Sequence, residues 1–235
     1  MGLYSAAFAH RLPLDDLTGT PIALLDKVDT TTYCAMFQTN TISRPAFDPI
    51  LLHEPVSLRR LTPGDYAAWA QLRGDSRTHL TAWEQEWSAD DLSRSAFRRR
   101  LRFYERQARA STGLSLAIFS SDETAMVGGL SLTNIRFGAV RSGVLGYWIG
   151  APFTKKGYGR AAVEAILRHS FHTLDLNRVE AACQPENAAS KKLLERCGFA
   201  REGLARDYLR INGRWLDHEI FAITARQYSD GQRDT

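Results

Sequence analysis

Apolar and polar residues alternate in a regular pattern from about residue 50 of the chain onward. Residues 56–61 alternate with the two-residue period of a strand, and Thr62-Pro63-Gly64-Asp65 has the composition of a helix start. The apolar positions after it recur at helical spacing: Tyr66, Trp69, Ala70 and Leu72. Residues 92–108 predict a second, very basic helix. Residues 114–120 and 125–132 predict two strands joined by a short turn at 121–123.

The second half of the chain continues this alternation of strands and helices. The expected elements are a strand at 143–149, a helix at 158–173, a strand at 178–183, a helix at 188–197, and two strands at 205–211 and 215–224. Gly198 supplies a left-handed residue after the last helix. Asn212-Gly213 is a strong signal for a hairpin turn between the last two strands. The order predicts an α+β fold with a mixed sheet that is mostly antiparallel.

The pattern divides the chain into three parts. We expect an N-terminal extension at 1–48, one folded domain at 49–230 and a short tail at 231–235. Prolines and glycines break up the extension, so it is either weakly ordered or a strap on the domain. A third interpretation is that translation naturally starts at Met36.

Composition is ordinary for a globular protein. Of its 235 residues, 44% are hydrophobic and 24% are charged. A domain of this length can bury a full core without disulfides or metals. No apolar run approaches the roughly 20 residues that cross a bilayer. The start of the chain does not look like a signal peptide. These features predict a cytoplasmic protein that binds no membrane. They leave open whether it is a monomer or a homodimer.

Cysteine and histidine usage argues against a metal site. The three cysteines are Cys34, Cys183 and Cys197, and none forms a C-x-x-C pair. His169 and His172 lie three residues apart on a predicted helix, but no third ligand is placed beside them. We therefore expect no metal.

The net charge of +4 favours an acidic ligand or a nucleic acid as a binding partner. The predicted helix at 94–109 carries a run of arginines interleaved with Phe97, Phe103 and Tyr104. Two interpretations stand for this run: a solvated helix face, or a weak contact with RNA. Lysine is rare in the chain, yet four of the five lysines occur as the pairs 155–156 and 191–192.

One of these pairs lies in a glycine-containing loop at a predicted helix start. The strand Val144–Ile149 is followed by a short loop and then by the six residues Lys155, Lys156, Gly157, Tyr158, Gly159 and Arg160. Free amide groups and the positive end of the helix dipole make such a start an anion site. The basic side chains add charge. A pyrophosphate would suit this loop, but a simple tight turn before a helix explains the loop equally well.

A second segment adds specificity. The strand at 178–183 leads into Pro185-Glu186-Asn187, and a helix then runs to Gly198-Phe199. Asn187 has the position of a helix cap. Together with the basic loop, these elements occur in one order over about 60 residues, and that order resembles the GNAT superfamily of acetyltransferases.

The resemblance implies a donor site for acetyl-CoA. In the GNAT fold the strand at 144–149 splays from the strand at 178–183, and the pantetheine arm lies between them. Backbone groups near Tyr147, Trp148 and Ile149 would bind the arm, residues 155–160 would bind the pyrophosphate, and Asn187 would lie near the thioester. One departure is Thr154, which stands where the family usually has Gln or Arg at the start of its loop.

Further segments resemble the RimJ type of this superfamily, whose members acetylate the α-amino group of an N-terminal alanine on a ribosomal protein. They are His79–Glu84, Gly128–Asn134, Leu145–Gly150 and Asp207–His218, and the resemblance covers about residues 50–228. It implies a protein N-terminus as the acceptor and a ribosomal protein, or the ribosome, as the partner.

The resemblance leaves the catalytic residues less determined. Glu84 is the first candidate for the base, and a surface carboxylate or an ion pair is its alternative. Ser190 is a candidate donor to the sulfur of coenzyme A, and a hydroxyl that only bonds the helix backbone is its alternative. Other GNAT branches use a glutamate where this chain has Ala182 and a tyrosine where it has Leu194, so neither of those roles transfers.

Two other functions remain open at this point. The chain could acetylate a small amine, such as an antibiotic or a polyamine, because only the acceptor wall would differ. It could also be a protein that binds RNA or the ribosome without acetyltransferase activity.

Overall fold

The computed structural model describes residues 44–231, which form one eight-stranded sheet with helices on both faces. The strand order is β1-β2-β3-β4-β5-β6-β8-β7. The strands are β1 Leu51–His53, β2 Val56–Arg59, β3 Leu114–Ser120, β4 Met126–Arg136, β5 Ser142–Ile149, β6 Arg178–Cys183, β7 Ala200–Ile211 and β8 Arg214–Thr224. The α-helices are α2 Tyr66–Asp75, α3 Arg77–Thr81, α4 Arg94–Arg109, α5 Tyr158–His172, α6 Ala188–Arg196 and α7 Ala225–Gly231.

The predicted mixed α and β architecture is confirmed. β3 and β6 have the predicted bounds, while β7 begins at residue 200 instead of 205. Among the strands and α-helices of the described residues, three short ones were not predicted: β1, α3 and α7. β1 has three residues and α3 has five, so neither is long enough to show a periodic pattern.

The middle of the sheet separates where β5 meets β6. The two strands form a parallel pair from Ser142↔Arg178 to Leu145↔Ala181. β5 continues to Ile149 and β6 to Cys183, and these last residues do not pair with each other. The other strand pairs are antiparallel. The predicted splay between these two strands is therefore confirmed.

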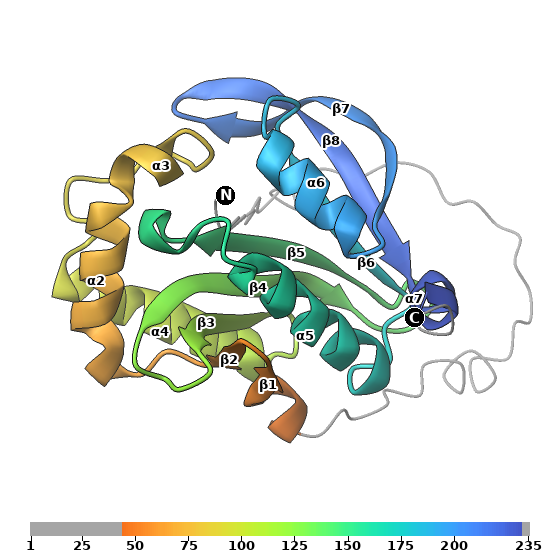
Figure 1. Ribbon diagram of the computed structural model, residues 1–235, viewed down its shortest axis with the longest axis horizontal. Helices are drawn as coiled ribbons and strands as arrows, with labels where there is room; N and C mark the ends of the chain where they lie inside the picture. Colours follow the sequence, from red (N-terminus) through yellow and green to blue (C-terminus); the bar gives the residue numbers. More distant parts are fainter. Residues whose placement is uncertain (1–43, 232–235) are drawn as a thin grey trace, which may run out of the picture.

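Each face of the sheet has its own hydrophobic core. Helices α5 and α6 lie over one face and α4 lies behind the other (Figure 1). The larger core joins the sheet to α5 through side chains such as Val163, Ile166 and Leu167. The smaller core joins α2 and α4 to the opposite face, and Phe97 lies fully buried within it.

β5 presents alternate side chains to these two cores. Tyr147 belongs to the larger core and Trp148 to the smaller one, as the period of a strand requires. Trp148 is 1% exposed, and its ring packs on the backbone of β4. A Cβ atom added at Gly129 would lie 2.4 Å from the indole Nε1, so only glycine leaves room for this ring.

The β7–β8 hairpin reaches across the molecule toward α3 (Figure 1). At its tip, Asn212 Nδ2 donates to the carbonyl oxygen of Thr81 at 2.8 Å. Asn212 and Gly213 both have positive φ, 46° and 78°, as the predicted turn requires. The hairpin therefore joins the C-terminal half of the sheet to the end of α3.

The predicted N-terminal extension, residues 1–48, lies mostly outside the described residues, as does most of the tail at 231–235. Within its described end, Ala46 and Phe47 are 4% and 3% exposed and pack in the larger core. The Ala46 carbonyl also bonds His169 Nε2 on α5 at 2.8 Å. The domain boundary at 48/49 and the start at Met36 stay predictions. Within the described residues, no helix has the length and apolarity needed to span a bilayer.

Candidate active site

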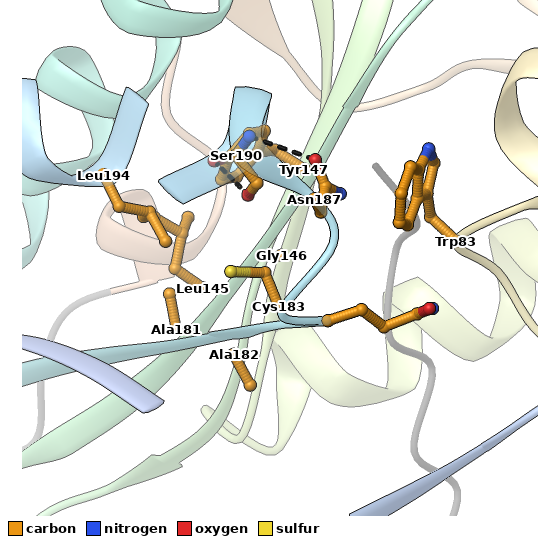
Figure 2. A pocket seen from close by; sticks show the side chains of 11 residues that line it. Trp83, Leu145, Gly146, Tyr147, Ala181, Ala182, Cys183, Asn187, Ser190 and Leu194 are labelled. Atoms are coloured by element: carbon orange, nitrogen blue, oxygen red, sulfur yellow. Dashed lines mark hydrogen bonds between the residues drawn. The ribbon is translucent and has the colours of Figure 1, made fainter. Parts of the chain in front are cut away.

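A small cavity opens where β5 and β6 separate, and it brings together two of the predicted site segments. Its lining comes from both strands, from the start of α6 and from the segment after α3 (Figure 2). The lining residues are Trp83, Leu145, Gly146, Tyr147, Ala181, Ala182, Cys183, Gln184, Asn187, Ser190 and Leu194. Tyr147, Asn187 and Ser190 were predicted as site residues. The other lining residues were not.

Two hydroxyl groups are paired inside this cavity. The Tyr147 hydroxyl and Ser190 Oγ lie 2.9 Å apart and form a buried hydrogen bond, drawn as a dashed line in Figure 2. Burial raises the pKa of Tyr147 well above its usual value, while the bond from Ser190 opposes the shift. Both groups are therefore neutral at physiological pH, and each can donate or accept a proton.

Asn187 starts α6 and supports this pair. Its Oδ1 accepts a hydrogen bond from the Ser190 backbone N–H at 3.1 Å, which is the helix cap that the sequence predicted. The cap holds Ser190 at the third helical position, where its side chain faces Tyr147 on β5. Asn187 is 6% exposed and also lines the cavity.

The segment after α3 and the end of β6 supply several of the cavity residues that could not be predicted from the sequence. Gln184 Nε2 lies 3.5 Å from the Ala82 carbonyl, which joins these two segments beside Trp83. Burial raises the pKa of the Cys183 thiol to about 11, so this thiol stays protonated at neutral pH. Trp83 directly precedes the predicted Glu84, but no pattern in the sequence shows which of the two side chains faces the cavity.

The basic loop has the backbone geometry of an anion site. Lys155 and Gly157 adopt positive φ, 61° and 87°, and Gly157 caps the start of α5. The first amide groups of a helix have no partner within it, and the helix dipole places positive charge there. Lys155, Lys156 and Arg160 are exposed around this start, so the loop offers both amide donors and positive side chains.

The residues of the basic loop make different contacts within the protein. A Cβ atom at Gly159 would lie 2.9 Å from Leu193 Cδ1 and 3.4 Å from Ile149 Cγ1, so this glycine lets α5 pack against α6 and β5. Arg160 Nε donates to Glu164 at 2.7 Å on the surface of α5. The Tyr158 ring meets the Phe153 ring edge-on at 6.0 Å. Of the two glycines in the loop, only Gly157 has the left-handed conformation.

The end of β5 lies next to the basic loop, so the two parts of the predicted site, the loop and the cavity at the splayed strands, are close together. Ile149 ends β5, is 5% exposed and contacts the start of α5 beside Gly159. The Trp148 side chain packs in the smaller core on the opposite face of the sheet, so only its backbone lies between Tyr147 and the basic loop. The basic loop therefore lies at the end of the strand that carries Tyr147.

Glu84, the predicted base, lies elsewhere. Its carboxylate accepts hydrogen bonds from Arg73 at 2.6 and 3.2 Å and from Trp87 Nε1 at 2.7 Å. The side chains of Arg73 and Glu84 are 4% and 7% exposed. Glu84 does not line the cavity at the splayed strands, whereas Trp83 does. This geometry matches the alternative interpretation, an ion pair, and lends the base role no support.

Three further residues near the hairpin have local roles. Asp217 Oδ1 accepts from the Asp207 backbone N–H at 2.9 Å. His218 is fully buried, its Nδ1 lies 3.0 Å from the Leu216 carbonyl, and its ring lies 5.8 Å from the Tyr208 ring. Burial lowers the pKa of His218, so it is neutral at physiological pH.

Comparisons with known proteins agree with this arrangement. Residues 56–200 match the model of the acetyltransferase (GNAT) domain. The chain is 31% identical over 170 residues to the ribosomal protein uS5-alanine N-acetyltransferase of Escherichia coli, which covers 72% of this chain and 88% of the relative. It is 34% identical over 152 residues to the probable N-acetyltransferase YjcK of Bacillus subtilis, covering 65% and 84% of the two chains.

Solved structures agree as well. RimJ of Mycobacterium smegmatis in complex with CoA-disulfide has a TM-score of 0.69 and 32% identity, covering 76% of this chain and 90% of that one. The ribosomal-protein-S5-alanine acetyltransferase of Vibrio fischeri has a TM-score of 0.71 and 27% identity, covering 77% and 99%. The family match extends from β2 to the start of β7 and includes both the basic loop and the cavity at the splay. The chain therefore belongs to the GNAT family of acetyltransferases.

Proposed function

We propose that this acetyltransferase moves an acetyl group from acetyl-CoA to the α-amino group of an N-terminal alanine of a ribosomal protein. Its similarity to an enzyme named for uS5 alanine supports the acceptor. The observation that carries the proposal is the buried hydroxyl pair of Tyr147 and Ser190 at the point where β5 and β6 separate.

The residues of the donor side fit acetyl-CoA. The left-handed Lys155 and Gly157 expose the amides at the start of α5, and three cations surround them, which suits a pyrophosphate. The end of β5, around Tyr147, Trp148 and Ile149, pairs with β4 but is unpaired on the side of β6, and this open edge suits the amides of an extended arm. We also assign Asn187 to this arm, because its amide lines the cavity beside Ser190.

When bound, acetyl-CoA supplies an acetyl group activated as a thioester. Attack of the neutral amine on the thioester carbon would form the C–N bond and break the C–S bond. Ser190 Oγ would give its proton to the departing sulfur, and the Tyr147 hydroxyl would hold Ser190 in position and pass on to it the proton that the amine nitrogen loses. A positioned donor of this kind contributes typically about 10²–10⁴-fold to the rate. Cys183, with a raised pKa, would remain a neutral part of the wall.

The acceptor needs little help to lose its proton. A free α-amino group has a pKa near 8, so about a tenth of it is neutral at pH 7. Holding this amine beside the thioester then supplies much of the remaining acceleration. A strong base is therefore not required, which agrees with the engagement of Glu84 by Arg73 and Trp87.

The acceptor is tested with a panel of peptides that begin with Ala, Ser, Met or Lys, together with spermidine as a small amine. We expect the alanine peptide to have the highest kcat/KM with acetyl-CoA. Faster acetylation of spermidine, or acetylation of the lysine side chain alone, would contradict the proposed acceptor.

The role of the hydroxyl pair is tested separately on the best acceptor. Ser190→Ala should lower kcat by about 10²-fold or more with little change in the KM for acetyl-CoA. Tyr147→Phe should have a smaller effect in the same direction. Ser229→Ala is a matched control, because this hydroxyl bonds only the backbone of α7. Full activity of Ser190→Ala would rule out the proton transfer.

A further inference from the structure

Helix α4 carries a row of arginines that the acetyl-transfer site does not use. Arg94, Arg98, Arg102 and Arg106 recur every four residues, and all four are exposed. We call these four residues the α4 ridge. The opposite side of the helix carries the buried residues Phe97 and Ala108, which face the sheet. The ridge therefore lies on the outer surface of the molecule, on the face away from α5 and α6 (Figure 1).

The ridge differs from the other arginines of α4 in its partners. Arg99 pairs with Asp90 at 2.7 Å, Arg100 with Asp91 at 3.3 Å and Arg109 with Glu105 at 2.6 Å. Among residues 44–231, no carboxylate forms an ion pair with any ridge arginine. Arg94 only stacks on the Tyr66 ring at 4.3 Å, and Arg106 approaches Phe103 at 5.8 Å. The ridge charges are thus available to a ligand.

Positive charge in this protein is concentrated on α4. The helix has seven arginines and one glutamate, which gives +6, whereas the whole chain has a net charge of +4. The rest of the chain therefore carries −2. Since a general excess of basic residues would be spread over the surface, this distribution points to a local anionic partner.

The spacing of the ridge suits a polyphosphate chain. Residues four apart on a helix are separated by about 6 Å along its axis, so the four guanidinium groups span about 18 Å. A nucleic-acid strand presents a phosphate about every 3.4 Å of stacked length, and a less stacked strand presents them further apart. About five intervals of 3.4 Å fit into 18 Å, so up to six successive phosphates of a stacked strand, and fewer of an extended one, can lie along the ridge.

A hollow lies beside the ridge and adds aromatic surface. Its volume is about 450 Å³, and it lies between α4 and residues 84–88. Phe103, Tyr104 and Arg106 line it from α4, and Glu86 lines it from the opposite side. Aromatic rings next to arginines are the elements on which proteins stack unpaired bases.

We propose that the α4 ridge binds the backbone of a single-stranded nucleic acid, with one base entering the adjacent hollow against Phe103. An acidic peptide is the other polyanion to consider. The exposed carboxylate of Glu86, which lines the hollow, would repel acidic side chains, but it can accept hydrogen bonds from the amino groups of bases. The observations therefore favour a nucleic acid.

The test measures binding of fluorescently labelled 12-nucleotide single-stranded RNA and DNA by anisotropy, between 50 and 200 mM KCl. Each phosphate contact contributes a slope of about −0.7 to log K against log salt, so four contacts predict about a 50-fold loss of affinity over this range. Arg98→Gln/Arg102→Gln should retain two contacts and lose only about 7-fold. Both nucleic acids should bind within a few-fold of each other.

Matched controls separate the ridge from charge in general. Arg168→Gln/Arg226→Gln removes the same charge from two exposed arginines on α5 and α7 and should bind like the wild type. Phe103→Leu should weaken binding without changing the salt slope. An unaltered slope in the ridge variant, wild-type affinity in Phe103→Leu, or tighter binding of a 12-residue polyglutamate would each overturn the proposal.

This inference does not rest on the proposed acetyl transfer. The ridge variant should acetylate a free alanine peptide at the wild-type rate, because no ridge residue lines the cavity at the splay. Loss of RNA binding and loss of activity are therefore separate results. A protein with full nucleic-acid binding and no transfer would refute only the proposed function.

Discussion

Replacing Glu84 with glutamine removes one charge from a buried pair. The carboxylate accepts two hydrogen bonds from Arg73 and one from Trp87, and both charged side chains are less than 10% exposed. Glutamine has nearly the same shape, but it leaves the Arg73 charge without a counterion in the smaller core. The predicted result is a less stable protein whose site is intact.

The size of the expected stability loss follows from the burial of the Arg73–Glu84 pair. Breaking a buried ion pair by removing one partner costs about 3–5 kcal/mol of stability. The Trp87 and Trp148 rings lie 4.2 and 5.1 Å from the Arg73 guanidinium and attract the cation, so the lower end of this range applies. With a urea slope of about 3 kcal/mol/M, the midpoint of unfolding should fall by about 1 M.

The assay combines urea unfolding with kcat/KM of the folded enzyme across pH. Asp90→Asn is the matched control, because it breaks an exposed pair with Arg99 and should leave the midpoint unchanged. Arg73→Met/Glu84→Gln removes the uncompensated charge and should recover part of the lost stability.

The opposite outcome would refute this reasoning. A Glu84→Gln protein of wild-type stability whose kcat/KM falls by about 10²-fold or more, with the acidic limb of its pH profile lost, would make Glu84 the base. A double variant no more stable than the single variant would show that the buried charge is not the cause of the loss.

Two further predictions concern packing and pH. Gly159→Val should lower the free energy of unfolding by about 1–3 kcal/mol, because the added atoms press on Leu193 and Ile149; an unchanged Tm in calorimetry would contradict this. His169 is buried, which lowers its pKa below the ordinary 6.5, so the unfolded chain binds its proton first. The free energy of unfolding should therefore reach its full value above about pH 6.5 and decrease as the pH falls below it, less steeply in His169→Asn. If urea unfolding at pH 5–7 shows the same dependence on pH in both proteins, His169 is excluded as a cause.

Elements whose signals are local could be predicted from the sequence. Three local features depend on the backbone preferences of single residues, so they could be predicted from neighbouring positions: the turn at Asn212-Gly213, the cap at Asn187 and the left-handed Gly198. The order of strand, basic loop and capped helix was also visible, because each of its parts lies within a short segment. That order predicted the family and the anion site.

Tertiary structure decided which side chains meet across the chain. Tyr147 and Ser190 are 43 residues apart, and their bond depends on the separation of β5 from β6 and on the packing of α6 over it. Glu84 and its neighbour Trp83 could not be distinguished in sequence, because the direction of each side chain in an irregular segment depends on what packs against it. Arg73 on α2, 11 residues before Glu84, binds the Glu84 carboxylate, whereas the neighbouring Trp83 lines the cavity.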